Sequence, residues 1–471
     1  MIQQAVPVRK ELISTGSAIR STIPMHAPAE QKPLALPLSS KAARTKDAPI
    51  SYLIAMAMRN PGVINLAAGL VDPLTLPVEA CGEIAARIFS DPARGRAALQ
   101  YDTTLGLADL RREALKHLLK LEGAEAGSMG LTPDDVVVTT GSQQALYLVG
   151  DVLVDPGDIV IAAGPSYFVF TGALDSLGAT ILSVPMDENG MDVDAVERLL
   201  ARIESQGKLG RVKFVYCTSY YQNPTGLTLS AERRPRLLEI IKRFSKDHRI
   251  LVLEDAAYRE LRYDGPAHRS IKSYDPDNLY TVISQTFSKP FAPGLKLGYS
   301  AMPADLLHAV LQQKGSHDFG TSSLAQHLAL EAFRDGSYAR QVEVLRKGYR
   351  AKRDIVLSSL KQFMPKDKDI HWTHPHGGLY VWLTLPDFIN TSRTGAMFAR
   401  CVDHGVLYVP GEYCFQASEG GAVPENQLRL SYGQVAPDQI SHGIQRLAEV
   451  VGELVAEHQS QSSHLRAGTT P

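Results

Sequence analysis

The sequence predicts an α/β protein built on a mostly parallel sheet with helices on both faces, together with a smaller α+β domain. Continuous apolar runs alternate with helical segments between about residues 136 and 284. Such uninterrupted apolar strands are typical of a sheet that is buried on both faces. From about Ala339 the alternation stops, and a long charged helical segment that ends near Phe363 precedes one further apolar strand.

The individual elements follow from the apolar runs and the turn residues between them. The β-branched run at 136–139 leads into Gly141-Ser142, which opens a helical stretch over 143–154. A second helix is expected after the loop at 219–226, with Ser230 as its N-cap. The other expected strands lie at 158–162, 181–184, 213–218, 250–253, 280–284 and, in the smaller domain, 379–385.

Composition divides the chain into five segments. Residues 1–46 contain five prolines and seven Lys or Arg against two Glu, and we expect a flexible leader there. The leader fits a targeting peptide only in part, so targeting stays open beside an arm that wraps a partner subunit. After it we expect an N-terminal segment that joins the small domain (47–95), a large domain (96–335), a small C-terminal domain (336–458) and a disordered tail (459–471).

Charge and cysteine content exclude several classes of partner and site. The 471 residues carry 49 Lys and Arg against 50 Asp and Glu, a balance that gives no electrostatic reason to expect nucleic acid or a membrane surface. The four cysteines form no CxxC pair, so we expect a reducing, cytoplasmic location. The most apolar stretch, 145–163, contains three Asp, which argues against a transmembrane helix.

Polar residues follow several of the predicted strands, at the edge where open α/β sheets bind ligands. Gly141-Ser142-Gln143 starts a helix, where free N–H groups suit a phosphate, although a plain N-capped turn explains the same residues. Asp255 ends an apolar strand, so its carboxylate must be solvated, paired or a helix N-cap. Neither GxGxxG nor GxxxxGK followed by Ser or Thr occurs.

Eight short motifs are distributed through residues 60–435. In chain order they are YDTTLG, TTGSQQAL, GPSY, QNPTG, LEDAAY, TFSKPFAPGLKLGY, HGGLYVW and RLSYG. With these motifs the chain resembles the pyridoxal-phosphate enzymes of the aspartate aminotransferase fold type (class I/II), and most closely the branch of 2-aminoadipate and kynurenine aminotransferases. The resemblance implies a fold type I large domain, pyridoxal 5'-phosphate as cofactor, and a homodimer with shared active sites.

The resemblance implies a role at the cofactor ring for five residues. Lys289 would form the imine with the cofactor aldehyde and shuttle the α-proton. Asp255 would pair with the protonated pyridine nitrogen, while Asn223 and Tyr258 would hydrogen-bond the phenolic oxygen. Tyr167 would stack on the ring, although a core aromatic residue is the simpler explanation of that position by itself.

Further roles concern the phosphate and the substrate. By resemblance, Arg429 would clamp the substrate α-carboxylate through a bidentate fork, and Asn223 and Gly69 would also line the substrate pocket. A surface arginine on a strand and a bare turn are the simpler explanations of Arg429 and Gly69. The residues expected at the phosphate are Ser142, Gln143, Thr286, Ser288, Lys296 and, from the neighbouring subunit, Tyr101.

Two positions depart from the family pattern, and one cluster suggests a metal. Lys296 stands where the family usually has arginine, which keeps the charge and loses the planar fork. Val71 stands where proline is common. His371, His374 and His376 lie close in sequence, but no carboxylate or cysteine motif accompanies them, so we expect no metal.

The expected activity is transamination from an α-amino acid (2-aminoadipate-like, aromatic or aliphatic) to a 2-oxo acid, with 2-oxoglutarate as the acceptor by resemblance. A lyase, a decarboxylase or a racemase of the same fold is the main alternative, because these enzymes share the lysine-bound cofactor. A noncatalytic effector-binding regulator is the alternative of another class. Such regulators carry an N-terminal basic winged helix, for which the about 50 proline-punctuated residues before the matching region are too few and too irregular.

Overall fold

The computed structural model describes residues 36–47, 49–416 and 422–467, with side chains up to residue 461. Residues from Ser40 onward form one compact unit. Most of the expected leader falls on residues 1–35, which lie outside the described residues. Within the described ranges, no helix combines the length and the apolar character needed to cross a membrane.

The larger sheet carries the predicted α/β pattern. Among the described residues it has seven strands, and its parallel strands confirm a mostly parallel sheet. The exception is β10, which runs antiparallel to both of its neighbours and was not predicted as a strand. In spatial order the strands are β2 (Val136–Thr139), β10 (Gly298–Ala301), β9 (Thr281–Thr286), β8 (Leu251–Asp255), β7 (Val212–Thr218), β3 (Ile159–Ala163) and β4 (Thr180–Val184).

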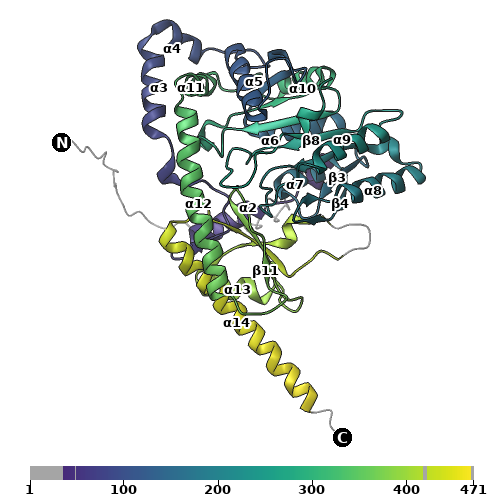
Figure 1. The fold of residues 1–471 in the computed structure, drawn as a ribbon, viewed down its shortest axis with the longest axis vertical. Coiled ribbons are helices and arrows are strands. Elements are labelled where there is room, and N and C mark those ends of the chain that lie inside the picture. Colours follow the sequence, from purple (N-terminus) through teal and green to yellow (C-terminus); the bar gives the residue numbers. More distant parts are fainter. Residues whose placement is uncertain (1–35, 48, 417–421, 468–471) are drawn as a thin grey trace, which may run out of the picture. The chain divides into compact units, whose positions relative to one another are not determined.

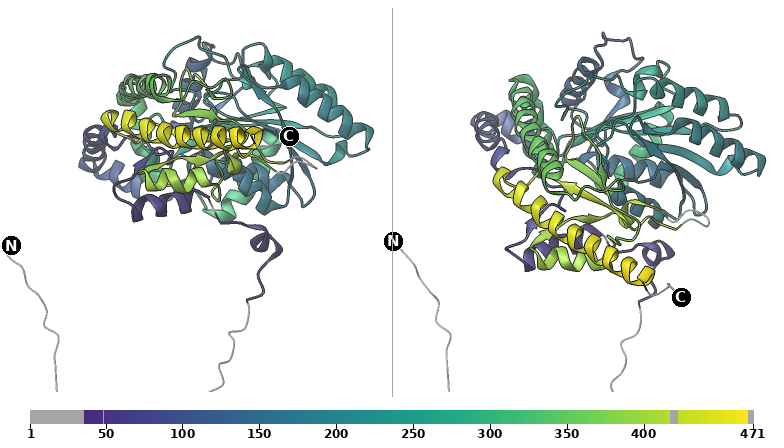
Figure 2. Two further views of the ribbon diagram at one scale, coloured as in Figure 1. Left: turned by 90° about the horizontal axis from the view of Figure 1, so that it is seen from below. Right: turned by 60° about the horizontal axis from the view of Figure 1, so that its bottom comes forward.

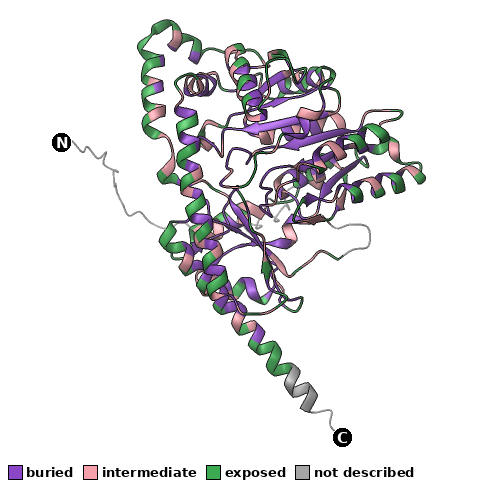
Figure 3. Cartoon of the chain, viewed as in Figure 1, coloured by how far each residue is buried: buried purple, intermediate pink, exposed green. Residues whose placement is uncertain are grey.

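Helices cover both faces of this sheet, and the strands are buried between them (Figure 3). Along β3, Ile159 and Ile161 pack on one helical layer, whereas Val160 and Ala162 pack on the other. The first layer contains α8 (Val193–Ser205) and α9 (Arg233–Phe244). The second contains α6 (Gly141–Leu153), α7 (Phe168–Leu177) and α10 (Ala304–His317).

A second, antiparallel sheet follows in the C-terminal part of the chain. Its order is β11 (His371–Trp372), β12 (Tyr380–Thr384), β15 (Gln427–Ser431) and β14 (Val409–Pro410). Two short pairs complete the strands: β1 (Ile64–Asn65) with β13 (Val406–Leu407), and β5 (Met186–Asp187) with β6 (Gly190–Met191). The boundary between a large and a small domain stays a prediction.

The remaining helices include α5 (Ala108–Glu122), which packs against β2 of the larger sheet. The others are α1 (Ser40–Arg44), α2 (Pro49–Arg59), α3 (Val78–Ser90), α4 (Pro92–Leu99), α11 (Ser323–Arg334), α12 (Ser337–Phe363), α13 (Ala396–Asp403) and α14 (Pro437–Ala467). Short 3₁₀ turns span Pro73–Thr75, Pro133–Asp135, Leu209–Arg211, Ile271–Tyr274, Pro293–Leu295 and Gly411–Cys414. The long helices α12 and α14 pack against each other (Figures 1 and 2).

Three predicted boundaries need correction. The helix expected from Ser230 begins at Arg233, because Ala231 and Glu232 form a turn before it and Glu232 takes the N-cap position. Residues 40–44, expected in the flexible leader, form α1, and the Arg44 side chain donates to Ser176 O at the end of α7. The tail expected from residue 459 is helical to Ala467, since adding residues to an existing helix avoids the cost of nucleation.

Candidate active site

Ten of the thirteen predicted site residues line one cavity of about 240 Å³. The cavity lies where the parallel strands β7, β8 and β9 end, and the last residue of each strand, Thr218, Asp255 and Thr286, lines it. This is the edge at which open α/β sheets place ligands. The lining residues are Thr140, Gly141, Ser142, Gln143, Tyr167, Thr218, Asn223, Asp255, Ala257, Tyr258, Thr286, Ser288, Lys289, Pro293 and Lys296.

Asp255 is a buried carboxylate with neutral hydrogen-bond donors. Its Oδ2 accepts from the Tyr216 hydroxyl at 3.0 Å, and its Oδ1 accepts from the Ala257 N–H at 3.1 Å. Burial raises the pKa of Asp255 to about 6, although both of these bonds act to lower it. No regular helix starts after Asp255 in this described region, so the N-cap alternative is wrong. The carboxylate is placed to pair with a cation in the cavity.

Lys289 lines the cavity and contacts Gly69, which comes from a distant part of the chain. Lys289 follows β9, and its Nζ donates to Gly69 O at 2.8 Å. The same Nζ lies 5.9 Å from the centre of the Tyr258 ring. The lysine is therefore directed toward other candidate residues, and Gly69, although it does not line the cavity, lies next to Lys289.

Tyr258 contacts a second buried tyrosine, Tyr380, which the sequence analysis did not single out. The two hydroxyl oxygens are 2.9 Å apart, and the rings meet edge to face. Burial and the neighbouring Tyr380 raise the pKa of Tyr258 well above its usual range, so its hydroxyl keeps its proton. A Cβ on Gly69 would lie 2.5 Å from the Tyr380 hydroxyl, which explains why glycine suits that position. The signal was the tyrosine within the quoted motif HGGLYVW.

Arg429 lies on β15 and is 1% exposed, so the alternative of a surface arginine is wrong. Its Nη1 donates to Asn223 Oδ1 at 2.8 Å, and its Nη2 donates to Ala67 O at 2.7 Å. Its buried Nε has no hydrogen-bond partner among the described residues, and no described carboxylate lies within ion-pair distance. A buried cation without a counter-charge is costly, so the site favours an anionic ligand.

The start of α6 forms the polar end of the cavity. No side chain caps this helix, so the first N–H groups are free for a ligand. Gly141 has a φ of +73°, and a Cβ on the neighbouring Gly298 would lie 2.8 Å from Ser142 N. Gln143 Oε1 is buried without a hydrogen-bond partner among the described residues. Such a group of free polar atoms around a helix N-terminus suits a phosphate.

Three more predicted residues complete this polar end. Thr286 Oγ1 donates to Ser288 Oγ at 3.0 Å and accepts from the Ser288 N–H at 3.1 Å. Lys296 has a φ of +50° in the left-handed region and lines the same cavity. The Ser288 hydroxyl hydrogen and the Lys296 ammonium are therefore further donors near the start of α6.

The loop at 219–229 carries Asn223 and is fixed at its neck by Arg234 of α9. The Arg234 Nη2 donates to Ser219 O at 2.7 Å and to Leu229 O at 2.9 Å, which are the two ends of the loop. Directly after β11 of the second sheet, the Thr373 hydroxyl donates to Thr225 O at 2.7 Å. These contacts hold Asn223 where Arg429 binds it.

Tyr101 does not line the cavity. It is 82% exposed, and its ring meets that of Phe319 edge to face. It lines a different hollow together with residues of the 320–324 segment. Its expected contribution to the phosphate of a neighbouring subunit stays a prediction.

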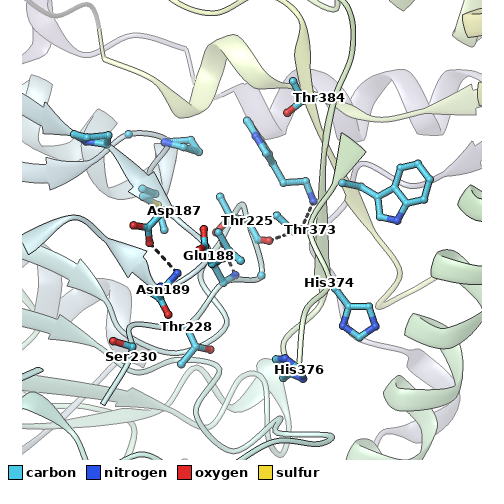
Figure 4. Close-up of a pocket in the computed structure, with 18 of the residues that line it drawn as sticks. Asp187, Glu188, Asn189, Thr225, Thr228, Ser230, Thr373, His374, His376 and Thr384 are labelled. Atoms are coloured by element: carbon cyan, nitrogen blue, oxygen red, sulfur yellow. Dashed lines mark hydrogen bonds between the residues drawn. The ribbon is translucent and has the colours of Figure 1, made fainter. Parts of the chain in front are cut away.

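A larger pocket of about 940 Å³ lies on another side of the Asn223 loop (Figure 4). Asp187, Glu188 and Asn189 lie on one side of it, and Thr373, His374 and His376 lie on the other. His371 also lines this pocket. Within the described ranges, no group of three or more His, Cys, Asp or Glu side chains is arranged to hold a metal ion. None of the thirteen predicted site residues lines this pocket.

Comparisons with known proteins agree with the motif order. The family profile "Aminotransferase class I and II" matches residues 61–447. The chain is 35% identical to the aromatic-amino-acid aminotransferase 1 of Thermococcus litoralis over 415 residues, which cover 88% of this chain and 94% of that protein. It is 34% identical to the 2-aminoadipate transaminase of Thermus thermophilus over 417 residues, which cover 88% of this chain and 96% of that protein.

A solved structure shows the same architecture. The crystal structure of a Pyrococcus horikoshii kynurenine aminotransferase in complex with PMP, KYN and KYA superposes with a TM-score of 0.80. The two chains share 34% identity, and the match covers 88% of this chain and 97% of that one.

Proposed function

The chain belongs to the class I and II aminotransferase family, and we propose that it transfers the amino group of an aromatic or 2-aminoadipate-like amino acid to 2-oxoglutarate. The names of the relatives support the choice of donor. The observation that carries the proposal is the buried Arg429, which binds Asn223 and has no carboxylate partner among the described residues. The Tyr380–Tyr258 pair lies between Arg429 and Lys289, because Arg429 contacts the Tyr380 ring and Lys289 contacts the Tyr258 ring. The chain is a pyridoxal-phosphate-dependent transaminase.

The cavity residues fit the cofactor at three points. Asp255 offers a buried carboxylate for the protonated pyridine nitrogen, which would keep it ionised. Asn223 gives its Oδ1 to Arg429, which leaves Nδ2 to donate to the phenolic oxygen beside the Tyr258 hydroxyl. We assign the phosphate to the start of α6 and to Ser142, Gln143, Thr286, Ser288 and Lys296, and we assign the ring face to Tyr167.

Each residue then has a defined task in the transfer. When bound, pyridoxal phosphate accepts the amino group and takes up the electron pair left at the substrate Cα. Lys289 Nζ would hold the cofactor aldehyde and then carry the proton from the substrate Cα to the former aldehyde carbon of the cofactor. Arg429 would bind the substrate α-carboxylate, which supplies the missing negative charge and fixes the orientation of Cα.

We further propose that the enzyme works as a homodimer. The exposed Tyr101 would donate to the phosphate of the partner subunit. A Tyr101→Phe chain mixed with a Lys289→Ala chain places both defects in one site and leaves the other site intact. Mixed dimers should therefore be more active than either parent, and equal activity would refute the sharing.

The test of the function is a half-reaction with one amino acid and no oxo acid. Transamination yields one oxo acid per site, together with pyridoxamine phosphate, and stops until 2-oxoglutarate is added. Release of carbon dioxide or the appearance of the opposite enantiomer would instead support a decarboxylase or a racemase. Borohydride should fix the cofactor on Lys289, and peptide mapping to another lysine would contradict the assignment.

A further inference from the structure

Tyr380 occupies the space between the groups assigned to the cofactor and those assigned to the substrate. It begins β12 and is buried. In the β12–β15 pair, Trp382 is opposite Arg429, so Tyr380 is a diagonal neighbour of Arg429 on the sheet. The Arg429 Cζ lies 4.5 Å from the centre of the Tyr380 ring, a cation–π distance.

The Tyr380 hydroxyl has one hydrogen-bond partner among the described side chains, the Tyr258 hydroxyl at 2.9 Å. Gly69 closes the space beside it, since a Cβ there would lie 2.5 Å away. If Tyr258 donates its only proton to the phenolic oxygen of the cofactor, the hydrogen between the two tyrosines has to come from Tyr380. The direction of this bond therefore follows from the assigned role of Tyr258.

We propose that Tyr380 is a positioning residue, which holds Arg429 against its ring and donates a hydrogen bond that strengthens Tyr258 as a donor to the cofactor. The inference rests on the function proposed above. Tyr380 then connects Arg429, which clamps the substrate carboxylate, with Tyr258. The Tyr258 hydroxyl in turn adjusts the basicity of the cofactor-bound Lys289 nitrogen.

The expected consequence has a definite sign. A hydroxyl that accepts a hydrogen bond becomes a better donor. A stronger bond from Tyr258 stabilises negative charge on the phenolic oxygen, which lowers the pKa of the Lys289 nitrogen when it is linked to the cofactor. Tyr380→Phe removes the bond but keeps the ring on Arg429, so that pKa should rise.

The experiment is a pH titration of the visible absorbance of the bound cofactor, which is independent of turnover. Tyr380→Phe should raise the apparent pKa of the cofactor-linked Lys289 nitrogen by about 0.3 to 1. The effect is small because a hydrogen bond accepted by the Tyr258 hydroxyl strengthens the bond that this hydroxyl donates by only a fraction. Tyr258→Phe should raise this pKa further. In the double variant Tyr380→Phe should add nothing, because its effect passes through the Tyr258 hydroxyl.

Tyr432→Phe is the matched control. Tyr432 is also a buried tyrosine near the β12–β15 pair, but its hydroxyl donates to Gly378 O, which Tyr263 also supplies with a hydrogen bond. Loss of this hydroxyl should leave the titration unchanged. The inference is overturned if Tyr380→Phe titrates like the wild type, if its shift adds in full to that of Tyr258→Phe, or if Tyr432→Phe shifts equally. A wild-type protein with no cofactor band would instead refute the proposed function.

Discussion

Two buried arginines, Arg234 and Arg429, bind opposite parts of the loop that carries Asn223, and they differ in how their charge is balanced. Arg234 holds the neck of the loop through Ser219 O and Leu229 O, and its Nη1 lies 3.6 Å from the buried Glu254 carboxylate. Arg429 binds Asn223 itself and has no such carboxylate among the described residues.

Under the proposed function, this difference distinguishes a structural cation from a substrate-binding one. Charge and burial are nearly the same at the two arginines, so composition and exposure alone do not distinguish them. The counter-charge does: Arg234 has its anion within the fold, whereas Arg429 has to obtain one from a ligand. The neighbouring carboxylates repeat the pattern, because Glu254 lies beside Arg234 while Asp255 has only neutral donors.

The largest expected effect is on stability at Arg234. Arg234→Met leaves Glu254 buried without its partner, which should lower the free energy of unfolding by about 3–5 kcal/mol. Denaturant unfolding measures this loss, and Glu254→Gln in the same chain should recover part of it. Amino-acid affinity of the folded protein should fall much less than at Arg429. If Arg234→Met instead weakened amino-acid binding strongly and left stability unchanged, Arg234 would not be the structural arginine of the pair.

Arg429→Ala should affect binding more than folding. Loss of a desolvated charge partner costs about 2–5 kcal/mol, which corresponds to roughly a 30- to 4,000-fold weaker affinity for amino acids. Stability should change little, because the variant also removes a buried and unbalanced cation. Titration with an amine that lacks a carboxylate provides the control, and an equal loss for both ligands would remove Arg429 from the clamp.

The raised pKa of Asp255 should make the stability of the cofactor-free protein depend on pH, and bound cofactor should abolish this dependence. In the folded protein the pKa of Asp255 is about 6, which exceeds that of an unfolded aspartate. Protonated Asp255 therefore contributes stability that is fully present below about pH 4 and is lost as pH rises through 6. The cofactor-free wild type should thus lose up to about 3 kcal/mol of stability relative to Asp255→Asn across this range.

Chemical unfolding of both proteins at several pH values measures this difference. With the cofactor bound, the pyridinium neutralises the carboxylate, and the trend between pH 4 and 6 should disappear. If the free energies of unfolding of the cofactor-free wild type and of Asp255→Asn changed equally with pH, burial would not raise the pKa of this carboxylate.

The smallest effect is expected at Lys296, a cation at the polar end of the cavity with no ion pair to a described carboxylate. Lys296→Arg should tighten cofactor binding by about 1 kcal/mol, because a planar fork can bond two phosphate oxygens at once. Lys296→Ala should lose cofactor on dialysis and regain much of its activity when cofactor is supplied. Equal affinities in a titration of all three proteins would show that Lys296 does not reach the phosphate.

Local patterns predicted most strands of the larger sheet, and the family motifs predicted most residues of the cavity. Asp255 ends an apolar strand and Lys289 follows one, both within quoted motifs, so their positions could be expected, while their roles came from the resemblance. The roles of Tyr380 and Arg234 were missed, although Tyr380 lies in a quoted motif, because they depend on contacts with residues more than ten positions away along the chain. The strand β10 was missed because it has only four residues, two of them at the end of a quoted motif, and they gave no alternation long enough to indicate a strand.

Because β10 lies late in the chain but pairs with the early strand β2, the part of the cavity formed by the start of α6 can form only late during synthesis. Within the described sheet, β2 is an edge strand whose one neighbour is β10, and Thr139 pairs with Gly298. Residues 136–139 therefore emerge from the ribosome long before their partner exists. Helix α6, which follows β2 directly, reaches its final place against the sheet only once the chain has been made to about Ala301. A chain that ended between Lys289 and Ala301 would contain Asp255 and Lys289, but it would lack the strand that places the start of α6, the proposed phosphate site.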